Sequence, residues 1–229
     1  MFEMPYRVSP LSFKVDGKEY FNERPISTFQ TAWSFISQMR SSLPREVGAC
    51  FWFGNDDGNM VAYTPMYSCI TRRPKCFSGE GADDVTFSMD NAFWVCNWVS
   101  NMVYPRYSMM FPSLKAVRDS LDASYSALQP EIEAKALALP TAEERVKYLT
   151  DYSCQKGDEV IARWQQLAFF LIVKYNDIVV KPTDENGRFE RNKFGGGARV
   201  QRPGMPEQYA HEFLQMTGDK FLVPEKEKK

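Results

Sequence analysis

The fold of this chain is decided by a short apolar run, Val47-Gly48-Ala49-Cys50-Phe51-Trp52-Phe53, which is rich in residues that favour β-strands. A dense turn signal follows it, Asn55-Asp56-Asp57-Gly58-Asn59. Residues 60–67 then form a second strand-like stretch, and Pro65 within it indicates an edge strand or a bulge. The two stretches predict an antiparallel pair of strands.

The segment before this pair predicts a hairpin and then a helix. Residues 11–21 alternate apolar and polar side chains around a tight turn at Asp16-Gly17, which is typical of a β-hairpin. Ser27 or Thr28 can cap a following helix that ends at Leu43-Pro44. That helix is expected because apolar residues recur at helical spacing: Phe29, Ala32, Trp33, Ile36 and Met39.

The region after the strand pair predicts a loop and then helices. Residues 72–84 contain Pro74 and two glycines and are typical of a loop. Asp90 can cap a buried helix that runs to about Met102 and ends before Pro105.

The next stretch predicts two more helices. A long helix is expected from about Ser113, with a break at Pro130. A capping box at Thr141-Ala142-Glu143-Glu144 starts another helical segment, and a further helix follows Gly157. Residues 177–181 predict a last strand.

A strand-rich first third and a helical remainder indicate an α+β or layered α/β class. We expect a strand-rich part over residues 1–87, a helical region packed on it over residues 88–181, and a mostly irregular tail over residues 182–229. The three consecutive glycines at 195–197 lack the Lys-Ser/Thr of a phosphate loop, so they indicate a flexible loop.

Composition excludes some classes of partner. Hydrophobic residues make up 44% and aromatic residues 14%, which is enough for a packed core. The 28 basic and 29 acidic residues give a net charge of −1, so nucleic acid and anionic membranes are not expected as partners. No apolar run reaches the roughly 18 residues of a membrane span, and no signal peptide is recognised. The compartment is therefore left open.

The sequence contains five cysteines and one histidine as candidates for nucleophilic or acid–base chemistry. The five cysteines have irregular spacings without a C-x-x-C motif, so no metal site is expected and most are small buried side chains; a Cys69–Cys76 disulfide is the alternative. His211 is the only histidine and lies in the tail, where a surface role is expected.

Two stretches of the sequence resemble a known family. The first runs from Phe21-Asn22-Glu23-Arg24-Pro25-Ile26-Ser27-Thr28 through Leu43-Pro44-Arg45-Glu46 to Phe51-Trp52-Phe53-Gly54. The second is Asn91-Ala92-Phe93-Trp94-Val95, with Asn97-Trp98-Val99-Ser100-Asn101-Met102 and Tyr104-Pro105-Arg106-Tyr107-Ser108 after it. Together they resemble the C-terminal half of bacterial cysteine dipeptidases. These are N-terminal-nucleophile (Ntn) hydrolases related to choloylglycine hydrolase and penicillin V acylase.

The resemblance implies a fold, a reaction and a missing part. The fold would be part of a four-layer αββα sandwich, whose remaining strands come from an N-terminal half. The family hydrolyses dipeptides through an acyl-enzyme on an N-terminal cysteine, without metal or organic cofactor. This chain begins Met1-Phe2-Glu3-Met4, so we expect it to lack the nucleophile and to be inactive alone. It should expose sheet edges or apolar faces that bind the missing half or another copy.

The resemblance assigns Arg24 near the start of the chain, and the neighbouring Asn22 is a candidate from its own chemistry. Arg24 matches an active-site arginine of the acylase relatives, where a guanidinium would stabilise developing negative charge or orient the thiolate. The alternative is a structural arginine that pairs with Glu23 or Glu46. Asn22 can donate to an oxyanion, or can cap the turn before Arg24.

Three further residues are candidates for substrate binding. Asn97 and Asn101 lie four apart, hence on one helix face, and either line a dipeptide pocket or tie the helix to neighbouring backbone. Arg106 can bind a substrate carboxylate. The adjacent carboxylates of Asp56 and Asp57 are explained by turn chemistry, with an acid–base or metal site as the alternative.

Three functional classes follow from these observations. The first is the C-terminal portion of a cysteine dipeptidase. The second is a non-catalytic binding or assembly protein derived from such an enzyme. The third is a two-chain enzyme in which a separate polypeptide supplies the cysteine.

Overall fold

The computed structural model describes residues 12–21 and 26–224, so Asn22 and Arg24 lie outside the described residues. The chain divides into two compact units, one over residues 2–172 and one over residues 173–229, to which Met1 is also assigned. Helices and strands are both abundant, which confirms the α+β class. The four-layer sandwich remains a prediction.

A three-stranded antiparallel sheet forms the centre of the first unit. It contains β3 (Trp33–Met39), β4 (Ala49–Asn55) and β5 (Thr64–Tyr67) in that spatial order, with the short helix α1 (Arg45–Gly48) between β3 and β4. The predicted pair of strands is confirmed as β4 and β5. Pro65 lies in β5, which is an edge of this sheet.

The helix predicted before residue 43 is wrong, because residues 33–39 form strand β3. Trp33, Phe35 and Met39 also fit the two-residue period of a strand, and hydrogen bonding to β4 satisfies the backbone of this segment. The predicted cap is used in a turn instead: the Thr28 hydroxyl oxygen accepts a hydrogen bond from the Gln30 N–H at 3.2 Å.

The hairpin prediction is confirmed by β1 (Ser12–Val15) and β2 (Lys18–Phe21). Asp16 and Gly17 have φ values of 50° and 74°, which are the positive values required at both central residues of a type I′ turn.

The bounds of the helices differ from those that the sequence indicated. Helix α2 (Ala92–Val103) begins one residue later than predicted, since the Asn91 side chain accepts from the Trp94 N–H. A short 3₁₀ helix, η2 (Tyr104–Arg106), leads into α3 (Tyr107–Leu137). The predicted break at Pro130 is wrong: α3 continues through it, because Pro130 lies on the exposed side and interrupts only a solvent-facing part of the ladder.

Helix α4 (Ala142–Tyr175) is one continuous helix rather than two segments. The capping box is confirmed, since the Glu144 N–H donates to the Thr141 hydroxyl and the Thr141 N–H donates to the Glu144 carboxylate, both at 3.2 Å. Gly157 lies inside α4, where a Cβ atom would meet the Pro74 ring at 2.5 Å. This glycine therefore permits the close approach of a loop.

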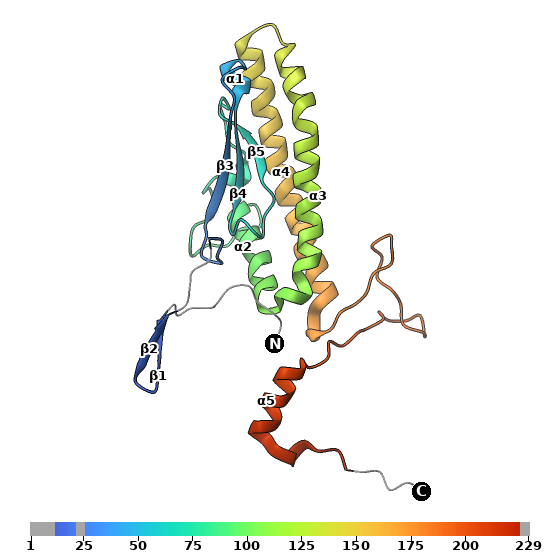
Figure 1. Ribbon diagram of the computed structural model, residues 1–229. Helices are drawn as coiled ribbons and strands as arrows, with labels where there is room; N and C mark the ends of the chain where they lie inside the picture. Colours follow the sequence, from blue (N-terminus) through green and yellow to red (C-terminus); the bar gives the residue numbers. More distant parts are fainter. Residues whose placement is uncertain (1–11, 22–25, 225–229) are drawn as a thin grey trace. The chain divides into compact units, whose positions relative to one another are not determined.

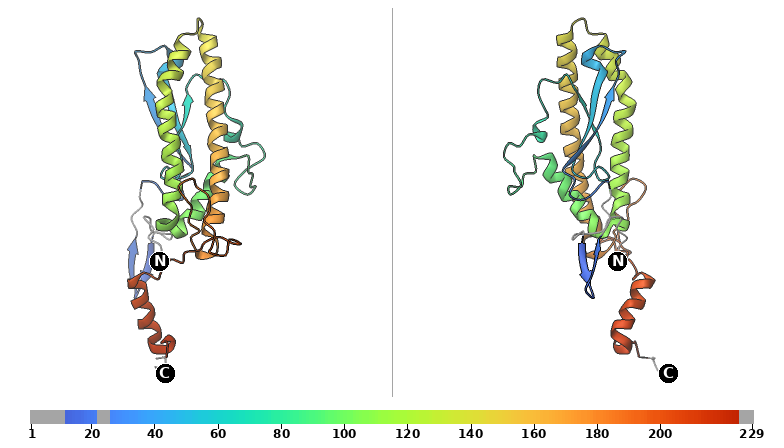
Figure 2. Two further views of the ribbon diagram at one scale, coloured as in Figure 1. Left: turned by 90° about the vertical axis from the view of Figure 1, so that its right-hand side faces the viewer. Right: turned by 60° about the vertical axis from the view of Figure 1, so that its left-hand side comes forward.

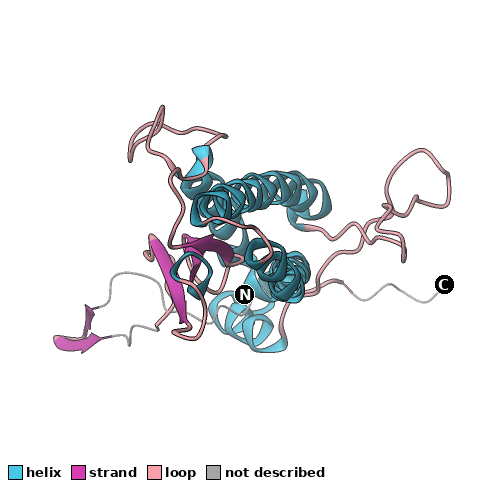
Figure 3. Cartoon of the chain, turned by 90° about the horizontal axis from the view of Figure 1, so that it is seen from above, coloured by secondary structure: helices cyan, strands magenta, loops and turns pink. Residues whose placement is uncertain are grey.

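Helices α3 and α4 form an antiparallel pair that lies against one side of the sheet (Figures 1 and 2). Figure 3 views this arrangement along the helices. A buried cluster joins the two layers: Val47, Cys50, Tyr67, Ala136, Leu149 and Tyr152. Strand residues on this inner face alternate with residues on the outer face.

A partly buried ion pair reinforces the contact between sheet and helices. Arg40 donates to both carboxylate oxygens of Glu133 in α3, at 2.7 and 2.5 Å. The same carboxylate accepts from the Tyr67 hydroxyl and from the Gln129 side chain. Fork-to-fork pairing of this kind is stronger than a neutral hydrogen bond and fixes the geometry of the contact.

The outer face of β3 and β4 is aromatic and largely uncovered, whereas the β5 residues on that face are buried. Trp33 and Phe35 stack on each other, and their rings also contact Phe53 and Phe51 from β4. Trp33 is 56% exposed and Met39 is 78% exposed. We call the side chains of Trp33, Phe35, Met39, Phe51 and Phe53 the aromatic face.

The second unit has little regular structure apart from one helix. It contains a 3₁₀ turn, η3 (Asn176–Ile178), isolated bridges such as Val180↔Gln201, helix α5 (Glu207–Thr217) and η4 (Gly218–Phe221). The predicted strand over 177–181 is reduced to that single bridge, because Asp177 and Ile178 have positive φ values. No helix in the described parts of the chain is long and apolar enough to cross a membrane.

Candidate functional site

The most unusual polar site of the first unit is the turn that follows β4, residues 55–59, which we call the acidic turn. Asp56 and Asp57 are both fully buried, with 0% exposure. Asp56 has a φ of 72°, a left-handed conformation that is uncommon outside glycine, and its N–H donates to the Ala32 carbonyl at 2.8 Å. In an ordinary surface turn both carboxylates would be exposed to solvent. Buried carboxylates next to a strained backbone conformation are instead typical of functional sites.

Helix α2 supplies the donors for Asp56. The Asn97 side chain donates to Oδ1 at 2.8 Å, and the Ser100 hydroxyl donates to Oδ2 at 2.5 Å. Asn97 and Ser100 are three residues apart and therefore share one face of the helix. Burial raises the pKa of Asp56, and these two hydrogen bonds oppose the effect.

Asp57 is less well satisfied. Its Oδ1 accepts from the Asn59 N–H at 2.9 Å, whereas its Oδ2 is buried and has no hydrogen-bond partner among the described residues. Burial, with a contribution from the neighbouring Asp56 charge, raises the pKa of Asp57 to about 6. Asp57 therefore changes protonation state close to neutral pH.

Asn59 connects the acidic turn to its surroundings. Its N–H also lies 3.1 Å from the Ser27 hydroxyl, its side-chain amide donates to the Tyr107 hydroxyl at 3.1 Å, and its carbonyl accepts from Arg118 at 2.5 Å. The turn is thus held by α2, by α3 and by the segment that begins at Ile26.

The predicted site residues fall into three groups. Asn22 and Arg24 lie outside the described residues, and Ser27, three residues after Arg24, contacts the acidic turn. Asn97 contacts that turn directly, whereas the exposed Asn101 side chain donates to the Asn97 carbonyl at 2.8 Å. Arg106 lies in η2, next to the Tyr107 that bonds to Asn59. These contacts do not test a role in binding substrate.

The turn chemistry expected for Asp56 and Asp57 is present, but the sequence did not indicate their burial or their partners. Ser100, Asn59 and Arg118 were not singled out. One available signal was the spacing of Asn97 and Ser100 on a helix that is otherwise apolar.

The cysteines of this chain are mostly buried. All five are free, so the Cys69–Cys76 disulfide is not formed. Burial raises the pKa of every one of these thiols, to about 12 for Cys50 and Cys76. Reactive cysteines usually have a lowered pKa, which is the opposite of the shift found for these five thiols. Among the described residues there is also no group of three or more metal-binding side chains.

Comparison with known proteins finds one similarity, which lies in the first part of the chain. The family model described as peptidase family C69 matches residues 7–120, a segment that contains the sheet, the acidic turn, α2 and the first part of α3. No curated protein matches the sequence. Over residues 7–120 the chain is therefore similar to the C69 family of cysteine peptidases.

Proposed function

We propose that this chain is the part of a C69-type cysteine dipeptidase that completes the active site around a cysteine outside residues 1–229. The observation that carries the proposal is the match of residues 7–120 to that peptidase family. The nucleophile would reside on another segment or polypeptide, because four of the five cysteines of this chain are buried and burial raises the pKa of all five thiols.

In the proposed reaction the thiolate of an N-terminal cysteine attacks the carbonyl carbon of a dipeptide, and its α-amine accepts the thiol proton. The proton passes to the departing amine when the C–N bond breaks, which leaves a thioester. Water then hydrolyses the thioester and regenerates the thiol. Arg24 and Asn22 would stabilise the negative charge on the carbonyl oxygen in both steps.

The acidic turn supports this role by anchoring the neighbouring segment. Ser27 bonds to Asn59, and Asn59 bonds to Tyr107 and Arg118 of the long helix α3. A rigid anchor three residues from Arg24 would limit the positions available to its guanidinium.

The aromatic face supports the idea that a second layer covers the sheet. Its residues occupy the face of β3 and β4 opposite to that of Cys50, and the outer-face positions of these two strands carry no charge. Packed sheets lie about 10 Å apart and bury such faces against each other. The occupant we propose is the polypeptide segment that carries the cysteine.

The test is a dipeptidase assay with purified chain, alone and with a companion polypeptide that begins with the cysteine-bearing half of a C69 peptidase. We expect no hydrolysis from the chain alone and hydrolysis of dipeptides from the mixture. Replacing the N-terminal cysteine of the companion polypeptide by alanine should abolish hydrolysis by the mixture. Arg24→Gln in this chain should lower kcat at least tenfold, whereas Arg45→Gln, on an exposed arginine, should not.

A non-catalytic binding or assembly protein is the second candidate, and the uncovered aromatic face favours it as well. It predicts tight association with the companion but no hydrolysis by the mixture. Hydrolysis by the chain alone would contradict both candidates and indicate an internal cysteine.

A further inference from the structure

A basic cavity lies on the first unit, between the end of β5 and the loop that precedes α2. Its volume is about 620 Å³, and it is lined by Ile70, Thr71, Arg72, Arg73, Lys75, Ser78 and Glu80. We propose that this cavity, the basic pocket, binds an oxyanion of a small molecule, either a carboxylate or a phosphate. The proposal does not depend on the peptidase function.

The loop that forms the basic pocket is held in place by helix α4. The Thr71 N–H donates to the Thr150 hydroxyl at 3.2 Å, and the Arg72 guanidinium donates to Asp151 at 2.7 Å. Pro74 packs against Gly157, where any larger residue would collide with its ring. The basic side chains therefore project from a fixed backbone, which reduces the entropy cost of binding.

The pocket carries an excess of positive charge. Three cations occur within four residues, and Asp151 neutralises only Arg72. Arg73 and Lys75 are exposed and have no ion-pair partner among the described residues, and Glu80 is the only carboxylate in the lining. A planar guanidinium and a nearby ammonium are the groups that bind carboxylate and phosphate oxygens in proteins.

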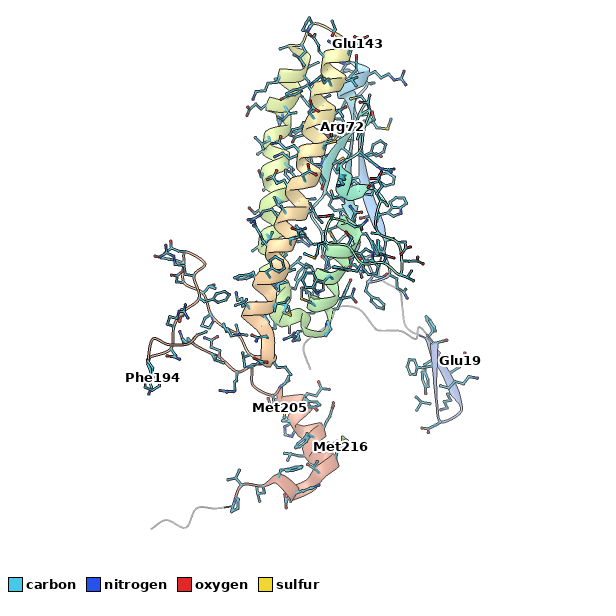
Figure 4. All side chains as sticks on the ribbon, turned by 180° about the vertical axis from the view of Figure 1, so that it is seen from behind. Glu19, Arg72, Glu143, Phe194, Met205 and Met216 are labelled. Carbon is cyan, nitrogen blue, oxygen red and sulfur yellow. The ribbon has the colours of Figure 1, made fainter. Side chains whose placement is uncertain are left out.

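The surroundings indicate a small ligand rather than a polyanion. The volume is within the range of small-molecule sites. Two neighbouring cavities, of about 530 and 510 Å³, share Arg72 with the basic pocket but include acidic residues of α4. Figure 4 shows Arg72 beside α4, with Glu143 near the start of that helix. The anionic end of a ligand would bind at Arg73 and Lys75, and its uncharged part would extend along the helix.

The test is a calorimetric titration of the full chain with three probes: inorganic phosphate, an N-acetylated dipeptide, and the C-terminal amide of that dipeptide. We expect saturable binding of one of the two anions and none of the amide. The double variant Arg73→Gln/Lys75→Gln should weaken that binding at least tenfold. The control Lys14→Gln/Lys18→Gln, which removes the same charge from the exposed hairpin, should leave it unchanged.

Phosphate binding alone would identify a phosphorylated ligand, and binding of the acetylated dipeptide alone would identify a carboxylate. Circular dichroism of both double variants checks that they remain folded. Failure of both anions to bind, or equal weakening in the two double variants, would overturn the proposal. Neither result would bear on the dipeptidase assay.

Discussion

The two faces of the β3–β4–β5 sheet are built from alternate residues of the same strands, but they have opposite surroundings. On the inner face Cys50 and Tyr67 are buried against α3 and α4, and the Arg40 guanidinium donates to both carboxylate oxygens of Glu133. On the outer face Trp33 and its neighbours contact one another and remain exposed. The difference indicates that the inner face stabilises this chain, whereas the exposed outer face of β3 and β4 is the surface that our proposal covers with a second layer.

The largest effect should come from opening a cavity behind the inner face. Leu149 of α4 is fully buried in the cluster that joins the helices to the sheet. Leu149→Ala should reduce the free energy of unfolding by about 4 kcal/mol, as measured by denaturant titration. If the loss is below about 1 kcal/mol, α4 does not pack on the sheet as described.

A somewhat smaller effect is expected for the ion pair on the same face. Glu133→Gln removes the negative charge that faces Arg40, and it should cost about 3 kcal/mol because the guanidinium is then partly buried without a counter-charge. The matched control is Glu131→Gln, which breaks an exposed pair with Lys135 and should cost less than about 0.5 kcal/mol. Equal effects of the two substitutions would contradict a buried role for Glu133.

Local signals account for the parts of this fold that the sequence predicted. The Asp16-Gly17 turn and the Thr141 capping box each depend on residues within a few positions of one another. Strand β3 was missed because Trp33 and Ile36 fit a helical period as well as a strand, and only pairing with β4 decides between them. The break predicted at Pro130 does not occur, because the packing of the long helix α3 stabilises it by more than the one backbone hydrogen bond that proline removes.

The site was harder to predict than the fold. Asp56 and Ser100 are 44 residues apart in sequence, and the Asn59–Arg118 contact spans 59 residues. No local pattern predicts that a turn of this composition will be buried by α2 and α3. The family resemblance located the region, but it did not point to Asp57.

Asp57 is the buried carboxylate that lacks a full set of hydrogen bonds, so its charge should affect stability. Its folded pKa of about 6 lies above the value of about 3.9 for an unfolded aspartate, so the folded state binds more protons between pH 4 and 6. Stability should therefore fall as pH rises through this window. Asp57→Asn should stabilise the chain by about 2 kcal/mol at pH 7 and by little at pH 4, as followed by thermal unfolding.

The matched control for Asp57→Asn is the same substitution at Asp56, because both carboxylate oxygens of Asp56 accept hydrogen bonds. Asp56→Asn places an amide group against the Asn97 amide and should destabilise the chain at every pH. Stabilisation by both substitutions would mean that the hydrogen bonds of Asp56 contribute nothing. Destabilisation by Asp57→Asn at pH 7 would instead indicate a cationic partner for the Asp57 carboxylate.

The smallest change in stability should come from the outer face, where the functional effect should be greatest. Trp33→Ser/Phe35→Ser removes two side chains that are about half exposed, so the free energy of unfolding should change by less than about 1 kcal/mol. The same variant should lose binding of a hydrophobic dye and of the companion polypeptide, because both need a contiguous apolar surface. A substitution on the exposed side of α3, Ala127→Ser, is the control that should alter neither. Large destabilisation of the double variant, with association retained, would mean that the aromatic face is part of the core of this chain and that the second layer binds elsewhere.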